Sequence, residues 1–225
     1  MTATSMKRFV LPVLAVALVA LVTTGFTLPS TSSDAALPDG PEIGAAAPAF
    51  TLTDTNGTEH ALADFAGQYV ILEWLNFDCP FVKRHYQTGN MQQLQQRAAE
   101  NDVVWLSIVS SAPGKQGHFS DEVMNERAAQ VEAQQAAILM DESGTVGRAY
   151  EAATTPHMYV IAPDGTLIYK GGIDDKPRGP IAEATNYVEA AVEAHMQGEP
   201  VAVPTSAPYG CSVKSAPAGS RDACG

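Results

Sequence analysis

The sequence predicts an α/β protein in which a mixed sheet is covered by helices on both faces. Nearly continuous apolar runs at 70–75 and 103–109 alternate with segments of helical periodicity, and such alternation is typical of parallel strands. Two later runs, 157–162 and 166–170, flank a Pro-Asp-Gly turn at 163–165, which joins antiparallel strands. With 45% hydrophobic and 17% charged residues, the chain of 225 residues can bury a core.

The first predicted element is a hairpin that extends the sheet at its N-terminal side. Residues 50–53 alternate as a short strand, the Asn-Gly pair at 56–57 is a strong turn signal, and residues 60–62 can pair back. A continuous apolar strand follows, as expected of a central strand that is covered on both faces. Apolar residues then recur at helical spacing over 80–100, and the sequence Thr-Gly-Asn at 88–90 predicts an interruption of that helix.

The second half of the predicted domain repeats the alternation of strands and helices. After the second buried strand, Ser120 can cap a helix that runs to about residue 135. A short strand at 138–140 and a short helix at 145–151 lead to the antiparallel hairpin. Apolar residues on one face of 181–196 predict a closing amphipathic helix.

The chain divides into four predicted segments. Residues 1–36 are interpreted as an export segment, 37–47 as a linker, 48–197 as the α/β domain, and 198–225 as a tail with two cysteines and no clear element. Two basic residues precede an apolar stretch at 9–28, which fits either a cleaved signal peptide or an N-terminal anchor in the inner membrane. Both alternatives place the domain in the periplasm or another extracytoplasmic compartment.

Composition excludes several classes of partner and cofactor. The net charge of −12, from 25 acidic and 13 basic residues, argues against nucleic acid, which requires a basic surface. We interpret the acidity as that of a soluble surface. Each cysteine is isolated from histidines at the separations of metal ligands, and no phosphate-binding loop is present. The sequence therefore predicts neither a metal site nor a bound cofactor.

Cys79 lies where a predicted strand ends and a helix begins. Unpaired N–H groups at a helix N-terminus stabilise a thiolate and can lower its pKa from about 8.5 toward about 3.5–7.5. Pro80 suits the first helical turn, and Lys83 and Arg84 add positive potential, whereas Asp78 opposes it. The pattern favours a reactive thiol. The alternative is a buried structural cysteine.

Three cysteines in an exported protein leave one unpaired thiol or one bond to another chain. The spacing permits the intramolecular pairs Cys79–Cys211, Cys79–Cys224 and Cys211–Cys224. A flexible tail can close a long loop at a tolerable entropic cost, so Cys211 can return to Cys79. A bond within the tail, Cys211–Cys224, is an ordinary arrangement for an exported protein. The residues alone leave these pairings open.

Several longer stretches resemble a known family. The stretches "APAFTLTDTNG", "LADFAGQYVILEWLNFDCPFV" and "TTPHMYVIAPDGTLIYKGGIDD" are similar to the thioredoxin-fold redoxin domain of TlpA-like thiol-disulfide oxidoreductases and of the AhpC/TSA (peroxiredoxin) superfamily. The resemblance covers residues 42–197 and implies a thioredoxin-like fold. It also implies that Pro156 is a cis-proline and that Thr155, which precedes it, faces Cys79, so that this pair positions the backbone of a substrate.

Four shorter motifs indicate a narrower resemblance. The motifs "DCPFVKRHY", "GNMQQLQ", "WLSIVSSAPGKQG" and "YGCSV" resemble a subgroup of exported thioredoxin-family proteins in which the cysteine of the last motif recurs near the end of the chain. This resemblance favours Cys211 as the partner of Cys79. Cys224 lies outside it.

The sequence departs from both signatures of the wider family. The C-x-x-C motif reads Cys79-Pro80-Phe81-Val82, so the adjacent second cysteine is missing. A peroxiredoxin carries Thr or Ser three residues before its cysteine, and here that residue is Asn76. A local dithiol and a standard peroxidase site are therefore both incomplete.

Together these features predict an exported enzyme without a bound cofactor, a thiol-disulfide oxidoreductase or a peroxiredoxin-like antioxidant enzyme. Cys79 is the expected nucleophile and Cys211 the expected resolving thiol. The expected partner is a protein thiol or disulfide, or a small peroxide. Two alternatives remain, a peroxiredoxin-type peroxidase and a non-catalytic binding module that keeps the fold. The predicted pocket around the thiol consists of Trp74, Asn76, Pro80, Val82 and His157.

Overall fold

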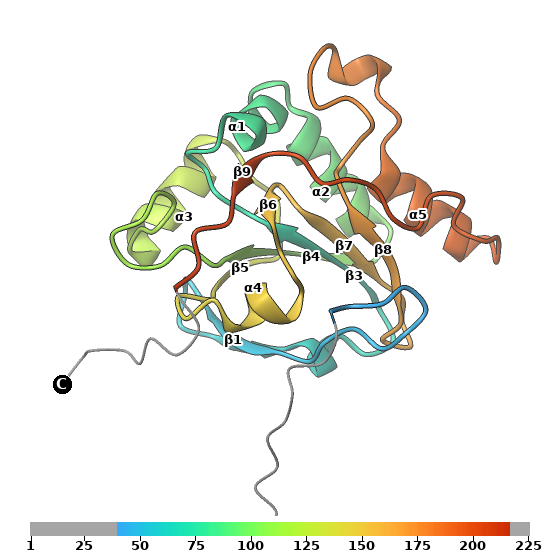
Figure 1. Cartoon of the computed structure of the whole chain (residues 1–225), viewed down its shortest axis with the longest axis horizontal. Coiled ribbons are helices and arrows are strands. Elements are labelled where there is room, and N and C mark those ends of the chain that lie inside the picture. Colours follow the sequence, from blue (N-terminus) through green and yellow to red (C-terminus); the bar gives the residue numbers. More distant parts are fainter. Residues whose placement is uncertain (1–39, 217–225) are drawn as a thin grey trace, which may run out of the picture. The chain divides into compact units, whose positions relative to one another are not determined.

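A seven-stranded mixed sheet is the centre of the computed structural model, which describes residues 40–216 (Figure 1). Its strands, in chain order, are β1 (Thr51–Asp54), β2 (Glu59–Ala61), β3 (Tyr69–Trp74), β4 (Val103–Val109), β5 (Ala137–Met140), β7 (Met158–Ile161) and β8 (Leu167–Gly171). Their order in the sheet is β2-β1-β5-β4-β3-β7-β8. A separate two-stranded sheet pairs β6 (Thr154–Thr155) with β9 (Cys211–Ser212).

The three central strands are parallel. β3 pairs with β4 in register Leu72↔Leu106, and β4 pairs with β5 in register Ile108↔Leu139. The flanking pairs β3–β7, β7–β8, β1–β5 and β1–β2 are antiparallel. The mixed sheet and its N-terminal hairpin are thus confirmed. Because the carboxyl ends of parallel strands meet at one edge of a sheet, the loops that follow β3, β4 and β5 lie together there.

Helices cover both faces of the sheet. They are α1 (Pro80–Gln87), α2 (Asn90–Glu100), α3 (Asp121–Gln130), α4 (Thr145–Ala149) and α5 (Tyr187–Met196), with the 3-10 turns η1 (Leu62–Phe65) and η2 (Ile181–Glu183). Side chains of β3 alternate between two apolar clusters. Ile71 packs in a cluster with α1, α2, α3 and α5. Val70 and Leu72 belong to the other cluster, with residues of α4 and η1. The predicted two-sided cover is confirmed.

Local sequence explains where the first helices begin and end. Cys79 is the N-cap of α1 and Pro80 its first helical residue, where the missing N–H is harmless. The predicted interruption is also confirmed, because α1 ends before Thr88 and α2 begins after Gly89. Gly89 adopts φ 72, a left-handed conformation that other residues rarely take.

Two predicted helices are shorter than their periodicity suggested. The Ser120 side chain caps α3 by accepting a hydrogen bond from the Val123 N–H at 3.5 Å, but α3 ends at Gln130, not near 135, and Glu132 has φ 52. The segment 181–196 is not one helix, because only η2 and α5 are helical. The Asn186 side chain accepts from the Glu189 N–H at 3.0 Å and begins α5 anew.

The ends of the domain also differ from the prediction. The Gly44 N–H donates to the Leu167 oxygen and the Ala47 N–H to the Gly165 oxygen, both at 2.9 Å, so this part of the predicted linker lies along the β7–β8 hairpin. The tail contains β9, where the sequence predicted no clear element. The predicted export segment and Cys224 lie outside the described residues.

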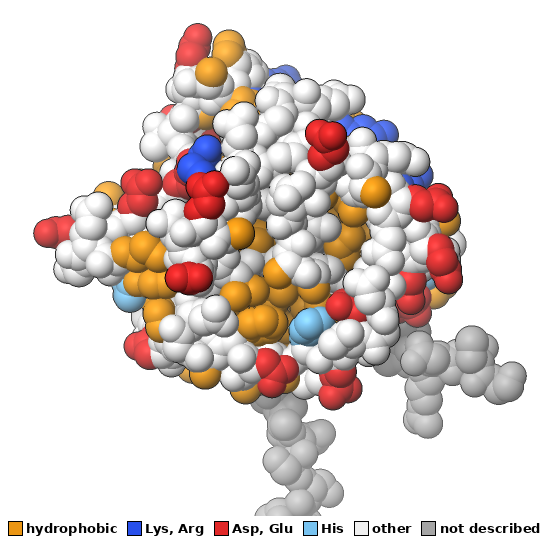
Figure 2. Space-filling view, turned by 180° about the vertical axis from the view of Figure 1, so that it is seen from behind, with side chains coloured by type: hydrophobic (Ala, Val, Ile, Leu, Met, Phe, Trp, Pro, Cys, Tyr) orange, Lys and Arg blue, Asp and Glu red, His pale blue; other side chains and the backbone are white. Residues whose placement is uncertain are grey.

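Acidic side chains outnumber basic ones on the described surface. On the face shown in Figure 2, acidic side chains are spread over the surface and basic ones are sparse. Within residues 40–216, no helix is both long enough and apolar enough to cross a membrane.

Candidate functional site

The candidate site is built around Cys79, at the edge where the parallel strands end. The chain turns after β3, and the Cys79 N–H donates to the Asn76 oxygen at 2.9 Å. Cys79 then opens α1 with extended backbone angles, φ −70 and ψ 125. Its own oxygen accepts the first helical hydrogen bond, from the Lys83 N–H at 2.9 Å. The side chain is fully buried, at 0% exposure.

Two segments that are distant in sequence contact the Cys79 sulfur. The thiol donates to the Thr155 oxygen at 2.9 Å, and the backbone N–H of Cys211 donates to Sγ at 3.4 Å. The Thr155–Pro156 peptide bond is cis, as the family resemblance implied. In the register of the small sheet, Thr155 pairs with Cys211. The tail cysteine is therefore beside Cys79, and neither of the two forms a disulfide within residues 40–216.

The electrostatics of the site distinguish the two thiols. Burial raises the pKa of Cys79, and hydrogen bonds with Cys211, the Val82 N–H and Thr155 lower it. The hydrogen bonds together outweigh burial, so the net pKa is below the ordinary value of a cysteine. Burial, and then the neighbouring Cys79, raise the pKa of Cys211 to about 11. Since the thiolate is the nucleophilic form, these pKa shifts favour Cys79 over Cys211 as the thiolate of the pair.

The tail holds Cys211 in place through backbone hydrogen bonds on both sides of β9. The Val213 N–H donates to the Ala153 oxygen at 3.0 Å, and the Ala112 N–H donates to the Lys214 oxygen at 2.9 Å. In Figure 1 the tail with β9 runs between β6 and α1. The arrangement covers the thiol with the protein's own chain.

Gly210 makes the close approach of the tail possible. It adopts φ 147, and a Cβ at this position would lie 2.0 Å from the Thr155 oxygen. Only a residue without a side chain fits at this distance. The glycine in the "YGC" motif is therefore a steric requirement of the pairing between β6 and β9.

We expect Gly210→Ala to separate Cys211 from Cys79. Because disulfide formation needs a narrow range of Cα and Cβ separations, oxidation of the pair should slow at least about tenfold. Mass spectrometry of the linked peptide at timed intervals after addition of oxidised glutathione measures this rate. Gly179→Ala is the control, since Gly179 has φ 98 but no atom within 4 Å of its Cβ position. Equal slowing in both variants would show that backbone strain, not contact with Thr155, is responsible.

The other predicted pocket residues have distinct surroundings. Asn76 is buried and its Oδ1 accepts from the Asp78 N–H at 2.9 Å, so it shapes the turn before Cys79. Val82 is buried beside the thiol and Pro80 is exposed at the helix start. Trp74 is the last residue of β3, and its Nε1–H donates to Ser110 Oγ at 3.0 Å. These side chains surround the site, and the sulfur itself forms hydrogen bonds with groups of α1, β6 and β9.

His157 is engaged away from the thiol. Its Nδ1 pairs with the Tyr159 hydroxyl at 3.0 Å and lies 3.3 Å from the Ala153 nitrogen. Burial, with the positive charge of Lys170, lowers its pKa to about 4, so the ring is neutral. Among the described residues no hydrogen bond joins His157 to Cys79. Its role as a pocket residue remains a prediction.

Sequence reasoning missed the buried carboxyl group of Glu73. This side chain lies within β3 at 0% exposure, and its Oε2 accepts from Trp105 Nε1 and Ser107 Oγ at 3.0 Å each. Its Oε1 has no hydrogen-bond partner among the described residues. Burial raises its pKa to about 7. An acidic residue inside a continuous apolar strand was the available signal. Within residues 40–216, no cluster of metal-ligating side chains is present.

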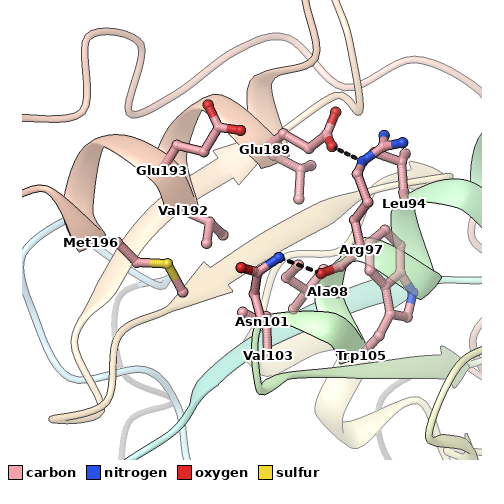
Figure 3. Close-up of a pocket in the computed structure, with 12 residues that line it drawn as sticks. Leu94, Arg97, Ala98, Asn101, Val103, Trp105, Glu189, Val192, Glu193 and Met196 are labelled. Carbon is pink, nitrogen blue, oxygen red and sulfur yellow. Dashed lines mark hydrogen bonds and ion pairs between the residues drawn. The ribbon is translucent and has the colours of Figure 1, made fainter.

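Two cavities lie outside the thiol site. One, of about 130 Å³, is lined by apolar residues of α2, α5, β3 and β4, and Arg97 pairs with Glu189 at its border (Figure 3). The other, of about 450 Å³, lies between α1 and α3. Its wall includes Asp78, which is paired with Arg127 at 2.8 Å. Neither cavity is lined by Cys79, which lies under the tail at β9 instead.

Comparisons with known proteins place the chain in a family. None of the curated proteins matches it. The structure of a hypothetical protein from Sinorhizobium meliloti is 24% identical in sequence and has a TM-score of 0.70. The match covers 79% of this chain and 97% of that chain. An uncharacterized conserved protein from Geobacillus kaustophilus is 28% identical, with a TM-score of 0.70 and coverages of 78% and 93%. The thioredoxin domain of a thiol-disulfide oxidoreductase from Bacteroides vulgatus is 18% identical, with a TM-score of 0.46 and coverages of 57% and 87%.

One family model matches a range of the chain that contains most of the sheet and the surroundings of Cys79. The model of the AhpC/TSA family matches residues 43–170, which is more than half of the chain. This range includes the central sheet strands, Cys79 and the cis-proline. The chain therefore belongs to the AhpC/TSA family and has a thioredoxin-like fold.

Proposed function

We propose that this protein is an exported thiol-disulfide oxidoreductase in which Cys79 is the nucleophile and Cys211 is the resolving thiol. The observation that carries the proposal is the position of the tail cysteine, whose N–H contacts Cys79 Sγ at 3.4 Å. Membership of a redox family supports chemistry at a cysteine. The missing second cysteine of the C-x-x-C motif is thus replaced in space by one from the tail.

The reaction proceeds by two thiol-disulfide exchanges. The Cys79 thiolate attacks one sulfur of a partner disulfide, forms a mixed disulfide and releases the other partner sulfur as a thiolate. Cys211 then loses its proton and attacks the Cys79 sulfur, which releases the second partner thiolate. The partner gains two electrons and two protons, and the protein is left with a Cys79–Cys211 disulfide. An external dithiol restores the two thiols, and the reverse sequence oxidises a partner.

The segment at Thr155 and Pro156 suits a role in positioning the partner. The Thr155 oxygen is 2.9 Å from Sγ, and β6 offers its edge for backbone pairing. A protein segment in extended conformation can use such an edge through main-chain hydrogen bonds. We therefore propose a protein thiol or disulfide as the partner.

Export of the protein is part of the proposal and depends on the sequence alone. The apolar stretch at 9–28, with basic residues before it, has the features of a signal peptide or an anchor. An extracytoplasmic compartment is also where disulfide exchange with folded partners takes place.

A peroxidase of the peroxiredoxin type is the second candidate. A thiolate with a lowered pKa and a neighbouring thiol can also reduce a peroxide, since Cys211 can resolve a sulfenic acid at Cys79. The side chain of Asn76, however, is occupied by the Asp78 N–H. Consumption of hydrogen peroxide that depends on Cys79 and outpaces disulfide reduction would select this candidate.

Disulfide mapping tests the proposed pairing. The exported protein is purified under acid quench, digested without reduction, and its linked peptides are identified by mass spectrometry. We expect a Cys79–Cys211 link in the oxidised protein. A Cys211–Cys224 link with Cys79 free would contradict the two-cysteine cycle and would leave either a one-cysteine catalyst or a binding module.

A further inference from the structure

We propose that residues 204–213 form a removable strap over the edge of β6, held closed by a latch at Tyr209, which has to lift before a partner can reach Cys79. The inference deepens the proposed function and rests on it. The structural reason is that the position a partner segment needs is filled by the protein's own tail. Cys79 has 0% exposure, so no partner disulfide can reach its sulfur while the strap is in place.

The strap pairs with β6 as an added strand. Cys211 is opposite Thr155 and Ser212 is opposite Thr154, in antiparallel register. Two-residue pairing is short, and an isolated two-stranded ribbon is only marginally stable in water. Once the Val213 N–H also releases the Ala153 oxygen, the strap can separate from β6 without disturbing the seven-stranded sheet, which shares no strand with this pair.

The start of the strap is fixed firmly to β8. The Ser206 hydroxyl pairs with the Tyr169 hydroxyl at 2.7 Å and accepts from the Gly172 N–H at 2.9 Å. The Lys170 N–H donates to the Pro204 oxygen at 3.1 Å, and the Ser206 N–H donates to the Lys170 oxygen at 3.2 Å. These contacts anchor the strap on the sheet, so movement near Cys211 does not require release of residues 204–206.

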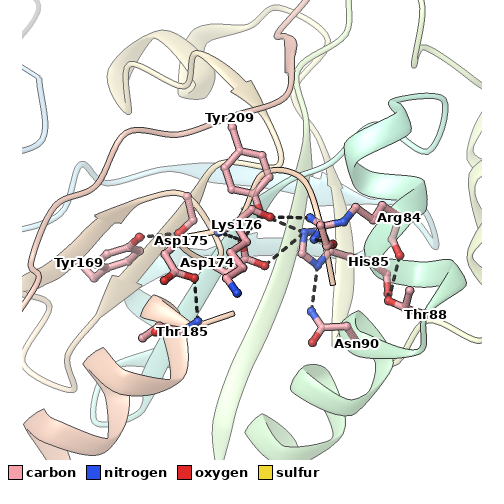
Figure 4. Close-up of polar contacts among 12 residues, drawn as sticks. Arg84, His85, Thr88, Asn90, Tyr169, Asp174, Asp175, Lys176, Thr185 and Tyr209 are labelled. Carbon is pink, nitrogen blue, oxygen red and sulfur yellow. Dashed lines mark hydrogen bonds and ion pairs between the residues drawn. The ribbon is translucent and has the colours of Figure 1, made fainter. Parts of the chain in front are cut away.

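Tyr209 is the contact that closes the strap between this anchor and Cys211. Its hydroxyl donates to Asp174 Oδ1 at 2.7 Å and lies 3.1 Å from His85 Nε2 (Figure 4). Asn90 Nδ2 is 2.9 Å from His85 Nδ1, so the amide donates there and the imidazole proton is on Nε2, where it donates to Tyr209. The ring packs against Phe81 with centroids 5.9 Å apart.

The strength of this latch suits a reversible device. Water can replace both hydroxyl contacts when Tyr209 swings out, so each of these hydrogen bonds makes only a modest net contribution to the closed state. Among the described residues Asp174 Oδ2 has no hydrogen-bond partner, and it lies 4.0 Å from His85 Nε2, so the polar groups around Tyr209 are not all satisfied even when the strap is closed. The closed state is therefore favoured but can open.

The strap also indicates the geometry of the partner that replaces it. A partner segment on the same edge has to be extended and to bring its cysteine opposite Thr155. Because a Cβ at the position of Gly210 would lie 2.0 Å from the Thr155 oxygen, a glycine before the partner's cysteine is the best fit. The strap and the partner segment compete for one edge.

The test compares two tyrosine variants of the reduced, full-length protein. Tyr209→Phe removes the hydroxyl of the latch and keeps the ring. Tyr69→Phe is the matched control, because it also removes a tyrosine–histidine contact, to His195 at 2.8 Å, but lies in β3. Alkylation of Cys79 by iodoacetamide is followed by mass spectrometry at a pH where its rate has reached a plateau. Amide hydrogen exchange of Ser206 and Val213 is measured in parallel.

For Tyr209→Phe we expect the alkylation rate of Cys79 to rise about tenfold, as loss of a latch of this strength implies. Exchange at Val213 should accelerate while Ser206 stays protected, and Tyr69→Phe should match the wild type in both. Equal rates in the wild type and Tyr209→Phe, in both measurements, would overturn the latch. A wild-type rate equal to that of the unfolded protein would overturn the strap. Because the protein is reduced throughout, failure of the Cys79–Cys211 cycle would be seen only in disulfide mapping and would leave these results unchanged.

Discussion

Replacing Cys79 with serine is expected to abolish reduction of a partner disulfide, and replacing Cys211 with serine is expected to trap the partner. A serine hydroxyl stays protonated at neutral pH without a neighbouring base, so turnover of Cys79→Ser should fall at least about a thousandfold. In Cys211→Ser the first exchange still occurs, but no second thiol attacks the mixed disulfide. The expected product is a covalent adduct between Cys79 and the partner.

Reduction of a glycine-cysteine peptide disulfide, followed by mass spectrometry, measures both effects. Cys224→Ser is the matched control, because it removes the third cysteine and leaves the proposed pair intact. Full turnover in Cys211→Ser would show that an external thiol resolves the mixed disulfide. An unreactive Cys79 in all variants would favour the binding module.

Replacing Glu73 with glutamine is expected to make the protein more stable above pH 7. Burial raises the pKa of Glu73 from 4.5 to about 7, so between these values the native state holds a proton that the unfolded state has lost. The native state is therefore destabilised as pH rises through this window, by about 3 kcal/mol at the upper end. Glutamine resembles the protonated acid and does not titrate, so Glu73→Gln should gain this amount relative to the wild type between pH 4.5 and 7.5.

The buried histidines, His85 and His157, change the stability of the native state with pH in the opposite direction to Glu73. Burial, followed by the charge of Arg84, lowers the pKa of His85 to about 4, and burial with Lys170 does the same for His157. The unfolded state binds these protons first as the solution is acidified, so stability rises from about pH 4 to about pH 6.5. In the wild type the titration of Glu73 offsets part of this gain. In Glu73→Gln only the rise in stability between about pH 4 and pH 6.5 should remain.

Urea denaturation at several pH values between 4.5 and 8 measures the two curves. Glu126→Gln is the control, because Glu126 is exposed on α3 and its replacement should leave the pH profile unchanged. A profile of Glu73→Gln that runs parallel to the wild type would contradict a raised pKa for this carboxyl group.

The sequence by itself determined the elements that depend on local patterns. Continuous apolar runs marked β3 and β4 because central parallel strands are buried on both faces. The cap at Cys79 and the break at Gly89 were also predictable, since helix ends depend on residues within one turn. Family resemblance supplied the cis bond before Pro156. Where two local signals competed, as between periodicity and the Asn186 cap, the prediction of one helix over 181–196 was wrong.

Only the tertiary structure decided how the tail is used. Cys211 is 132 residues from Cys79 in sequence, and the tail has no apolar periodicity from which a partner strand could be predicted. Its position depends on Gly210 fitting against the Thr155 oxygen and on Tyr209 reaching Asp174. The raised pKa of Glu73 likewise depends on complete burial within the assembled sheet. Contacts of this kind depend on shape and desolvation across distant segments, which no local sequence pattern contains.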